Sequence, residues 1–257
     1  SPSRCARCAV SSVGSAPSDS GVPFFTVITP VYDPPIERLR GCVESVRAQT
    51  FADWELILID DCSTRVETRE EIARLVASDP RISSQLREEN GGITLATNDG
   101  LRLAQGEHIA LLDHDDEIVP DALMYFAQAI TECPEADYLY SDEVICSASG
   151  EELWPMLKPA WSPERFRSHM YTCHISVIRT ALAREVGGYR TGFDGSQDYD
   201  MVLRVVEKAR RIVHIPRVLY RWYQAPDSVT SGTGAKPWAY DAGVRAQRSR
   251  ECITSHA

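Results

Sequence analysis

Several features that would assign a chain to a class at once are missing from these 257 residues. No apolar run approaches the roughly 18 residues that a membrane-spanning helix needs. Positive charge is scarce, because 27 Lys and Arg stand against 37 Asp and Glu, a formal net charge of -10. That balance argues against a nucleic-acid partner, which needs a basic face. Neither G-x-G-x-x-G nor G-x-x-x-x-G-K-[ST] occurs, which disfavours dinucleotide oxidoreductases and P-loop enzymes.

The cysteines and the N-terminal segment predict a reduced, cytoplasmic protein. Cys5 and Cys8 form a lone C-x-x-C, and most of the eight cysteines lie in apolar segments, where a thiol behaves as a small hydrophobe. Residues 1–22 are rich in Ser, Pro and small residues but lack the apolar core of a signal peptide. We expect residues 1–22 to be a disordered tail or linker, and residues 251–257 to be a second tail.

Alternation of apolar strands and amphipathic helices predicts an α/β fold. The predicted strands are 24–31, 54–59, 82–87 and 107–112, separated by helices over 36–46, 65–78 and 94–104. Such crossover units imply a Rossmann-like, mainly parallel sheet with helices on both faces. The second half mixes both kinds of element. Its predicted strands are 137–144, 175–178 and 211–223, and residues 148–163 are predicted to be a loop. Its predicted helices are 120–132, one that follows the strand at 175–178 and ends at 187, 198–208 and 238–250. We expect one domain over 23–250, with a nucleotide-binding half (23–118) and an acceptor half (119–250).

The most informative motif is Asp113-His114-Asp115-Asp116, directly after the strand at 107–112. Open α/β sheets bind ligands at the carboxyl ends of their strands. Three crowded carboxylates repel one another, and a divalent cation would neutralise them. Carboxylate oxygens suit Mg²⁺ or Mn²⁺, and the metal can in turn hold a diphosphate. The alternative is a solvated acidic turn that precedes the next helix.

These segments together resemble a family 2 glycosyltransferase domain of the GT-A type, from about Phe24 to Trp222. The pieces that match stand in the family's order: Thr29-Pro30-Val31-Tyr32, Leu58-Ile59-Asp60-Asp61-Cys62-Ser63, Asn90-Gly91-Gly92-Ile93 with Ala96, Asn98 and Gly100, Leu111-Leu112-Asp113-His114-Asp115-Asp116, Gly187-Gly188-Tyr189, Gln197-Asp198-Tyr199-Asp200 and His214-Ile215-Pro216.

The resemblance implies an inverting, metal-dependent transfer of a sugar from a nucleotide-diphosphate donor, a UDP- or dTDP-sugar, to a hydroxyl of a glycan or lipid-linked acceptor. Asp113 and Asp115 would bind Mn²⁺ or Mg²⁺, and Asp198 would be the base that accepts the acceptor's proton. The residues implied to contact the nucleotide are Pro30, Tyr32, Asp60, Asp61, Gly91, Asn98, Asp113 and His114. Alternatives remain: Asp198 as a helix N-terminal acid, Asp60 and Asp61 as a polar turn, and structural roles for Gly91 and Asn98.

The chain also departs from the family pattern. Gln197 replaces the usual Glu before the base, and Tyr223 and Ala225 stand where relatives carry a late Arg and His. His214 is a candidate third metal ligand, with a hydrogen-bonded core histidine as its alternative. A second hypothesis is therefore a catalytically impaired domain that binds a nucleotide sugar or glycan within a larger protein. Assembly on lipid carriers would place either form at the inner face of the cell membrane, as a peripheral protein or through an additional fused domain.

Overall fold

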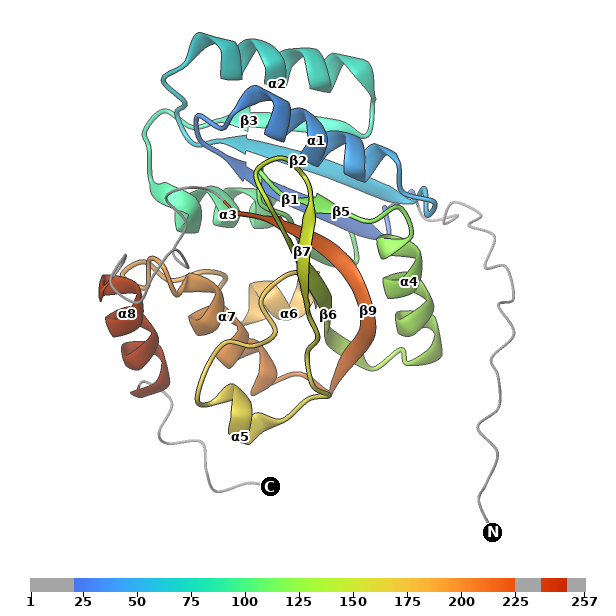
Figure 1. The fold of residues 1–257 in the computed structure, drawn as a ribbon, viewed down its shortest axis with the longest axis vertical. Helices are drawn as coiled ribbons and strands as arrows, with labels where there is room; N and C mark the ends of the chain where they lie inside the picture. The colour runs from blue at the N-terminus through green and yellow to red at the C-terminus, as the bar shows by residue number, and fades with distance from the viewer. Residues whose placement is uncertain (1–20, 225–236, 249–257) are drawn as a thin grey trace.

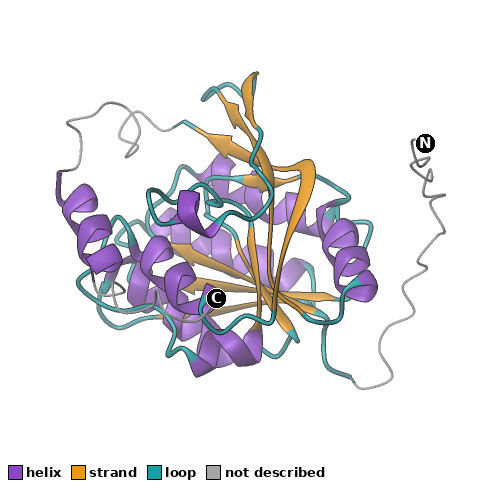
Figure 2. Ribbon diagram, turned by 90° about the horizontal axis from the view of Figure 1, so that it is seen from below, coloured by secondary structure: helices purple, strands orange, loops and turns teal. Residues whose placement is uncertain are grey.

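One mixed sheet runs through the molecule, and the computed structural model describes residues 21–224 and 237–248 of it. In this described part the sheet has nine strands in the order β3-β2-β1-β4-β8-β6-β9-β5, with β7 paired to β6 (Figure 1). Helices lie on both sides of the strands (Figure 2). The α/β class and the mainly parallel first half are as the sequence predicts.

The first half is a parallel sheet. Its strands are β1 (Phe25–Val31), β2 (Trp54–Asp60), β3 (Ile82–Leu86) and β4 (His108–Leu111), connected by α1 (Ile36–Arg47), α2 (Val66–Ser78) and α3 (Gly92–Leu103). Val31 pairs with Asp60, and Ile28 pairs with Leu111. Because β1, β2 and β4 are parallel and in this register, the loops after them leave from one edge of the sheet.

Two hydrophobic clusters cover the two faces of the sheet. On one face, Leu39 and Val43 of α1 pack with Leu75 of α2 against strand residues such as Val27 and Leu56. On the other face, Ile28 packs with residues of α3, α6 and α7. The buried pattern of β1, in which all seven residues are buried, follows from this cover on both faces.

The second half has the mixed character that the sequence predicts. Its elements are β5 (Glu117–Ile118), α4 (Ala122–Glu132), β6 (Ala136–Cys146), β7 (Glu152–Met156), α5 (Pro163–Phe166), β8 (Ser176–Arg179), α6 (Thr180–Glu185), α7 (Gln197–Val206), β9 (Arg211–Tyr223) and α8 (Pro237–Arg248). β8 is antiparallel to β4 and β6, whereas β9 is parallel to β6. The β6–β9 register shifts between Ser141 and Asp142, opposite Pro216, which has no N–H to donate.

The prediction of a loop over 148–163 is wrong in part. The segment contains β7, which pairs with β6 in antiparallel fashion, and the short helix α5 begins at its last residue, Pro163. All five residues of β7 are exposed, so the strand carries none of the apolar alternation that marks a half-buried strand. Backbone pairing to β6, a long-range contact, therefore decides its conformation.

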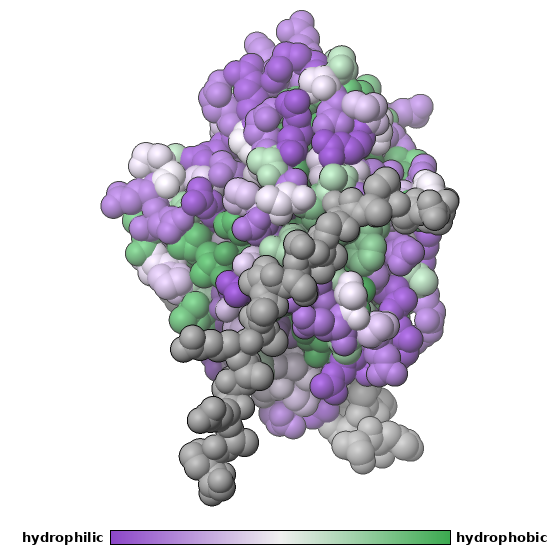
Figure 3. Space-filling view, turned by 90° about the vertical axis from the view of Figure 1, so that its right-hand side faces the viewer, coloured by the Kyte–Doolittle hydropathy of each residue, from purple (hydrophilic) through white to green (hydrophobic). Residues whose placement is uncertain are grey.

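The helices in the part of the chain that the structure describes were compared with the requirements for crossing a membrane. No helix there combines the length and the hydropathy required to cross a bilayer. The face in Figure 3 is mainly hydrophilic, with smaller hydrophobic areas between the charged side chains.

Candidate active site

A cleft of about 800 Å³ opens at the edge of the sheet where β1, β2 and β4 end. Both halves of the domain contribute to its walls. Residues that line it include Pro30, Tyr32, Asp61, Asp113, His114, Asp115, Met170, His174, Tyr189, Gln197, Asp198, Trp222 and Tyr223. Seven of the predicted site residues are in this set, whereas Asp60, Gly91, Asn98 and His214 are outside it.

Asp60 and Asp61 end β2 and hold the neighbouring loops. Asp60 Oδ1 accepts a hydrogen bond from the Ser63 amide at 2.8 Å. Asp61 accepts from the amides of Gly91 at 2.9 Å and Gly92 at 2.7 Å, and it pairs with Arg87. These contacts fix the start of α3 beside the cleft, as the alternative of a polar turn predicts. Asp61 still reaches the cleft wall.

Asn98 links α3 to the loop after α6. Its side chain donates to Tyr189 O and accepts from Tyr189 N, both at 2.8 Å. The pair of bonds holds Tyr189 against the cleft, where it lies close to Asp198. Asn98 thus contributes to the site through Tyr189. His114 has a similar supporting contact, with Nδ1 3.0 Å from Pro30 O.

The three carboxylates of the acidic motif have different surroundings. Asp116 is buried, accepting from Tyr220 Oη at 2.6 Å and from the Tyr223 amide at 2.8 Å. Burial and then the nearby Asp113 charge raise its pKa well above the usual range. Asp116 therefore ties the acidic loop to β9. Asp113 and Asp115 face the cleft.

Asp113 and Asp115 have the chemistry that a divalent cation requires. Both offer carboxylate oxygens, and burial, with repulsion from Asp113, raises the pKa of Asp115. A bound Mg²⁺ or Mn²⁺ would neutralise this repulsion and supply Lewis-acid stabilisation of a leaving diphosphate. Within residues 21–224 and 237–248, no three His, Cys, Asp or Glu side chains form a ready-made metal-binding group. A metal would therefore need further ligands, such as phosphate oxygens of a substrate.

Asp198 lies in the first turn of α7 and faces the same cleft. Burial, reinforced by the Asp113 charge, raises its pKa to about 6, although His174 opposes the shift. The buried neighbour Gln197 donates to Asp198 Oδ2 at 3.2 Å. A carboxylate with a pKa near neutrality is suited to take a proton from a hydroxyl group.

His174 is a cleft residue that the sequence analysis missed. Its Nε2 lies 3.7 Å from Asp113 Oδ2, and its Nδ1 lies 3.4 Å from Glu143 Oε2. Its ring stacks on Tyr220 with centroids 4.9 Å apart. Burial lowers the pKa of His174, but Glu143, Asp113 and Asp116 outweigh it and raise that pKa to about 9. The sequence signal for His174 is a polar segment before β8. His174 lies at the cleft because β8 runs antiparallel to β4, which brings the start of β8 to the edge where β4 ends.

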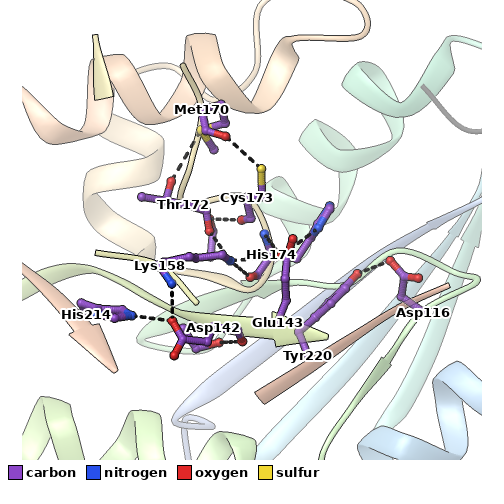
Figure 4. A network of polar contacts seen from close by, with 12 residues as sticks. Asp116, Asp142, Glu143, Lys158, Met170, Thr172, Cys173, His174, His214 and Tyr220 are labelled. Carbon is purple, nitrogen blue, oxygen red and sulfur yellow. Dashed lines mark hydrogen bonds and ion pairs between the residues drawn. The ribbon is translucent and has the colours of Figure 1, made fainter. Parts of the chain in front are cut away.

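A buried ion pair supports His174 from below, as Figure 4 shows. Lys158 Nζ lies 3.0 Å from Glu143 Oε2, and both side chains are only 3% exposed. Lys158 also donates to the carbonyl oxygens of Thr172, at 2.8 Å, and of His174. The ammonium group and its partners therefore fix the loop that presents the imidazole.

The structure does not bring His214 to the cleft. Its Nε2 lies 2.8 Å from Asp142 Oδ1, and its ring stacks on Tyr140 with centroids 4.8 Å apart. These contacts are those of a hydrogen-bonded core histidine, the alternative stated above, and they give no support to a role as metal ligand.

Comparison with known proteins decides the family. The model described as "Glycosyl transferase family 2" matches residues 26–186. The chain belongs to this family. The matched range runs from the second residue of β1 to just beyond α6 and includes the acidic motif and His174. The predicted glycosyltransferase assignment is confirmed.

Curated relatives of this family 2 glycosyltransferase domain are longer proteins. It is 43% identical to "Uncharacterized protein y4gI" of Sinorhizobium fredii, over 87% of this chain and 25% of that protein. It is 36% identical to "O-antigen biosynthesis protein RfbC" of Myxococcus xanthus, over 87% of this chain and 18% of that protein. The chain thus spans a quarter or less of the length of these two relatives.

Solved structures confirm the GT-A fold of the glycosyltransferase domain. Staphylococcus aureus TarS 1–349 in complex with UDP-GlcNAc matches with a TM-score of 0.71 and 20% identity, over 90% of this chain and 68% of that one. Mannosyltransferase PcManGT from Pyrobaculum calidifontis, in complex with GDP-Man and Mn²⁺, matches with a TM-score of 0.65 and 16% identity, over 94% and 68%.

Proposed function

We propose that this glycosyltransferase domain is an active, inverting enzyme that uses a divalent metal and a UDP- or dTDP-sugar. The observation that carries the proposal is the position of Asp198, whose pKa is near 6, on the same cleft as Asp113 and Asp115. A base and a diphosphate-binding acidic pair on one cleft are what a direct displacement at a sugar carbon requires.

In this proposal each group has one task. Asp113 and Asp115 would hold the metal that neutralises the departing nucleoside diphosphate. Asp198 would accept the proton of the acceptor hydroxyl as its oxygen bonds to the anomeric carbon. Attack from the side opposite the leaving group inverts that carbon. Burial of Asp198 keeps its basicity above that of an ordinary carboxylate.

Named relatives support the donor and acceptor classes. The TarS structure contains UDP-GlcNAc, and the PcManGT structure contains GDP-Man and Mn²⁺. RfbC is described as an O-antigen biosynthesis protein, and the Escherichia coli relative WcaA as a putative colanic acid biosynthesis glycosyl transferase. We therefore propose a glycan or lipid-linked acceptor, with transfer in the cytoplasm at the inner face of the cell membrane.

The second candidate is a nucleotide-sugar-binding domain with impaired catalysis. It is favoured by Tyr223, which occupies the position of the late arginine. The Tyr223 ring lies under the Arg38 guanidinium, 3.8 Å from its Cζ, and its amide is bonded to Asp116. Tyr223 itself brings no positive charge to the leaving diphosphate.

Substitution of Asp198 by Asn tests the proposal. Asn cannot accept the proton, so turnover should fall by about 10²–10⁴-fold, the scale of general-base catalysis. The experiment screens UDP- and dTDP-sugars for transfer or hydrolysis with Mn²⁺, and then compares the two proteins on the best donor. The unfolding temperature in the presence of UDP and Mn²⁺ is the control, because ligand binding raises it whether or not turnover occurs.

The same measurements separate the two candidates. Binding of UDP and Mn²⁺ without turnover of any donor by the unaltered protein would support the impaired domain. Full activity of Asp198→Asn would remove the assignment of the base.

A further inference from the structure

The distance between the His174 ring and the Asp113 carboxylate is suitable for two ligands of one cation. Nε2 and Oδ2 are 3.7 Å apart, beyond the range of a hydrogen bond. Two ligand atoms that each lie about 2.1–2.2 Å from one divalent cation are about 3.0–4.3 Å apart, depending on the angle between them. A single cation can therefore lie between these two atoms with little movement of either side chain.

Glu143 gives His174 the orientation that is typical of metal-binding histidines. Such histidines direct their second ring nitrogen at a carboxylate, which fixes the ring and its tautomer. Here Nδ1 lies 3.4 Å from Glu143 Oε2, and the same carboxylate accepts from the His174 amide at 3.2 Å. Nδ1 is buried and has no hydrogen-bond partner among the described residues. In a neutral ring with its proton on Nδ1, the lone pair of Nε2 faces Asp113.

Several contacts hold His174 in place. Lys158 compensates the Glu143 charge and bonds the His174 carbonyl group, and Tyr220 stacks on the imidazole. Acidic groups flank the ring, since carboxylate oxygens of Glu143 and Asp113 lie 3.4 Å and 3.7 Å from its two nitrogens. The negative field of these carboxylates attracts a cation that enters this end of the cleft.

We propose that His174 is a protein ligand of the divalent metal, beside Asp113, with Asp115 and the diphosphate of the donor completing the coordination. The inference rests on the proposed function. It assigns to His174 the role that the sequence suggested for His214. A site of few protein ligands completed by substrate phosphates is common for Mg²⁺. Among the described residues, His174, Asp113 and Asp115 do not already form a three-residue metal-binding group, so Asp115 would join the other two only when the ion binds.

Pulsed electron paramagnetic resonance of bound Mn²⁺ tests the proposal without relying on activity. The unaltered protein with Mn²⁺ and UDP should show ¹⁴N modulation from one imidazole. His174→Gln should remove the modulation and weaken Mn²⁺ binding by about 10–100-fold, the scale seen when metal sites lose a supporting group. Circular dichroism and the unfolding temperature show whether the variant is folded.

His214→Asn is the matched control, because it removes another imidazole of the same half of the domain, one outside the cleft, while Asn can still donate to Asp142. The ¹⁴N modulation should persist in this variant. Modulation that persists in folded His174→Gln, or that disappears in His214→Asn, overturns the proposal. A lack of imidazole modulation in the unaltered protein also overturns it, so the test stands even if a variant does not fold.

Failure of this inference is distinguishable from failure of the proposed function. Sugar transfer by a protein whose bound Mn²⁺ shows no imidazole signal removes only the His174 assignment. An imidazole signal that depends on His174, in a protein that transfers no sugar, leaves the metal site in place and removes the catalytic proposal.

Discussion

Two histidines of this domain contact two neighbouring acids of β6, and yet they lie in different environments. His214 meets Asp142 away from the cleft, whereas His174 lines the cleft and meets Glu143. Because successive side chains of a strand leave on opposite faces, neighbouring acids can serve two different sites. Lys158 is bonded to both, through its amide to Asp142 and through Nζ to Glu143. A histidine beside an acid thus does not by itself indicate a functional site. The face of the strand from which the acid projects decides whether the pair lies at the cleft.

Removal of the Lys158 charge should have the largest effect on this comparison. Lys158→Met leaves the buried Glu143 without its ammonium partner, and breaking a buried pair in this way lowers the free energy of unfolding by about 3–5 kcal/mol. Urea denaturation measures the change. Lys208→Met is the control, because the Lys208–Glu185 pair is 50% and 61% exposed and should contribute at most about 1 kcal/mol. Equal losses in both variants would contradict the importance of the buried pair.

The pH dependence of turnover should follow the ionisation of Asp198 in the cleft. Asp198 must be deprotonated to accept a proton, and its pKa is about 6. Below that pH the active fraction falls about tenfold per pH unit, and above it the rate should level off. Measurement of kcat/KM from pH 4.5 to 8, with folding checked by circular dichroism, gives the profile. A rate that stays constant down to pH 4.5 would contradict the base assignment.

Replacement of His214 should have the smallest effect. His214→Asn keeps a donor for Asp142 but loses the ring stacking on Tyr140, a contact of about 0.5–1.5 kcal/mol. The unfolding free energy should decrease by that amount, while the affinity for UDP with Mn²⁺, measured by calorimetry, stays the same. A large loss of affinity would return His214 to the list of site residues.

Local pattern was sufficient for much of the fold and part of the site. The conformation of apolar runs such as Phe25–Val31, and of helices with an apolar stripe such as α1, can be predicted from local sequence. The reason is that burial on one face or on two sets the spacing of the apolar residues. The edge shared by parallel strands then brings Asp61 and Asp113 to one cleft. β7 could not be found in this way, since its exposed residues are held by pairing to β6.

By itself the sequence determined the family, the α/β order of the first half and the position of acidic residues at the ends of its strands, because each of these depends on residues that are close together in the chain. Only the tertiary structure decided that His174, and not His214, faces the cleft, that Asp116 is bonded to β9, and that Lys158 and Glu143 form a buried pair beneath His174. These contacts join residues from different strands and loops. Their geometry depends on strand direction and on burial, which no local pattern encodes.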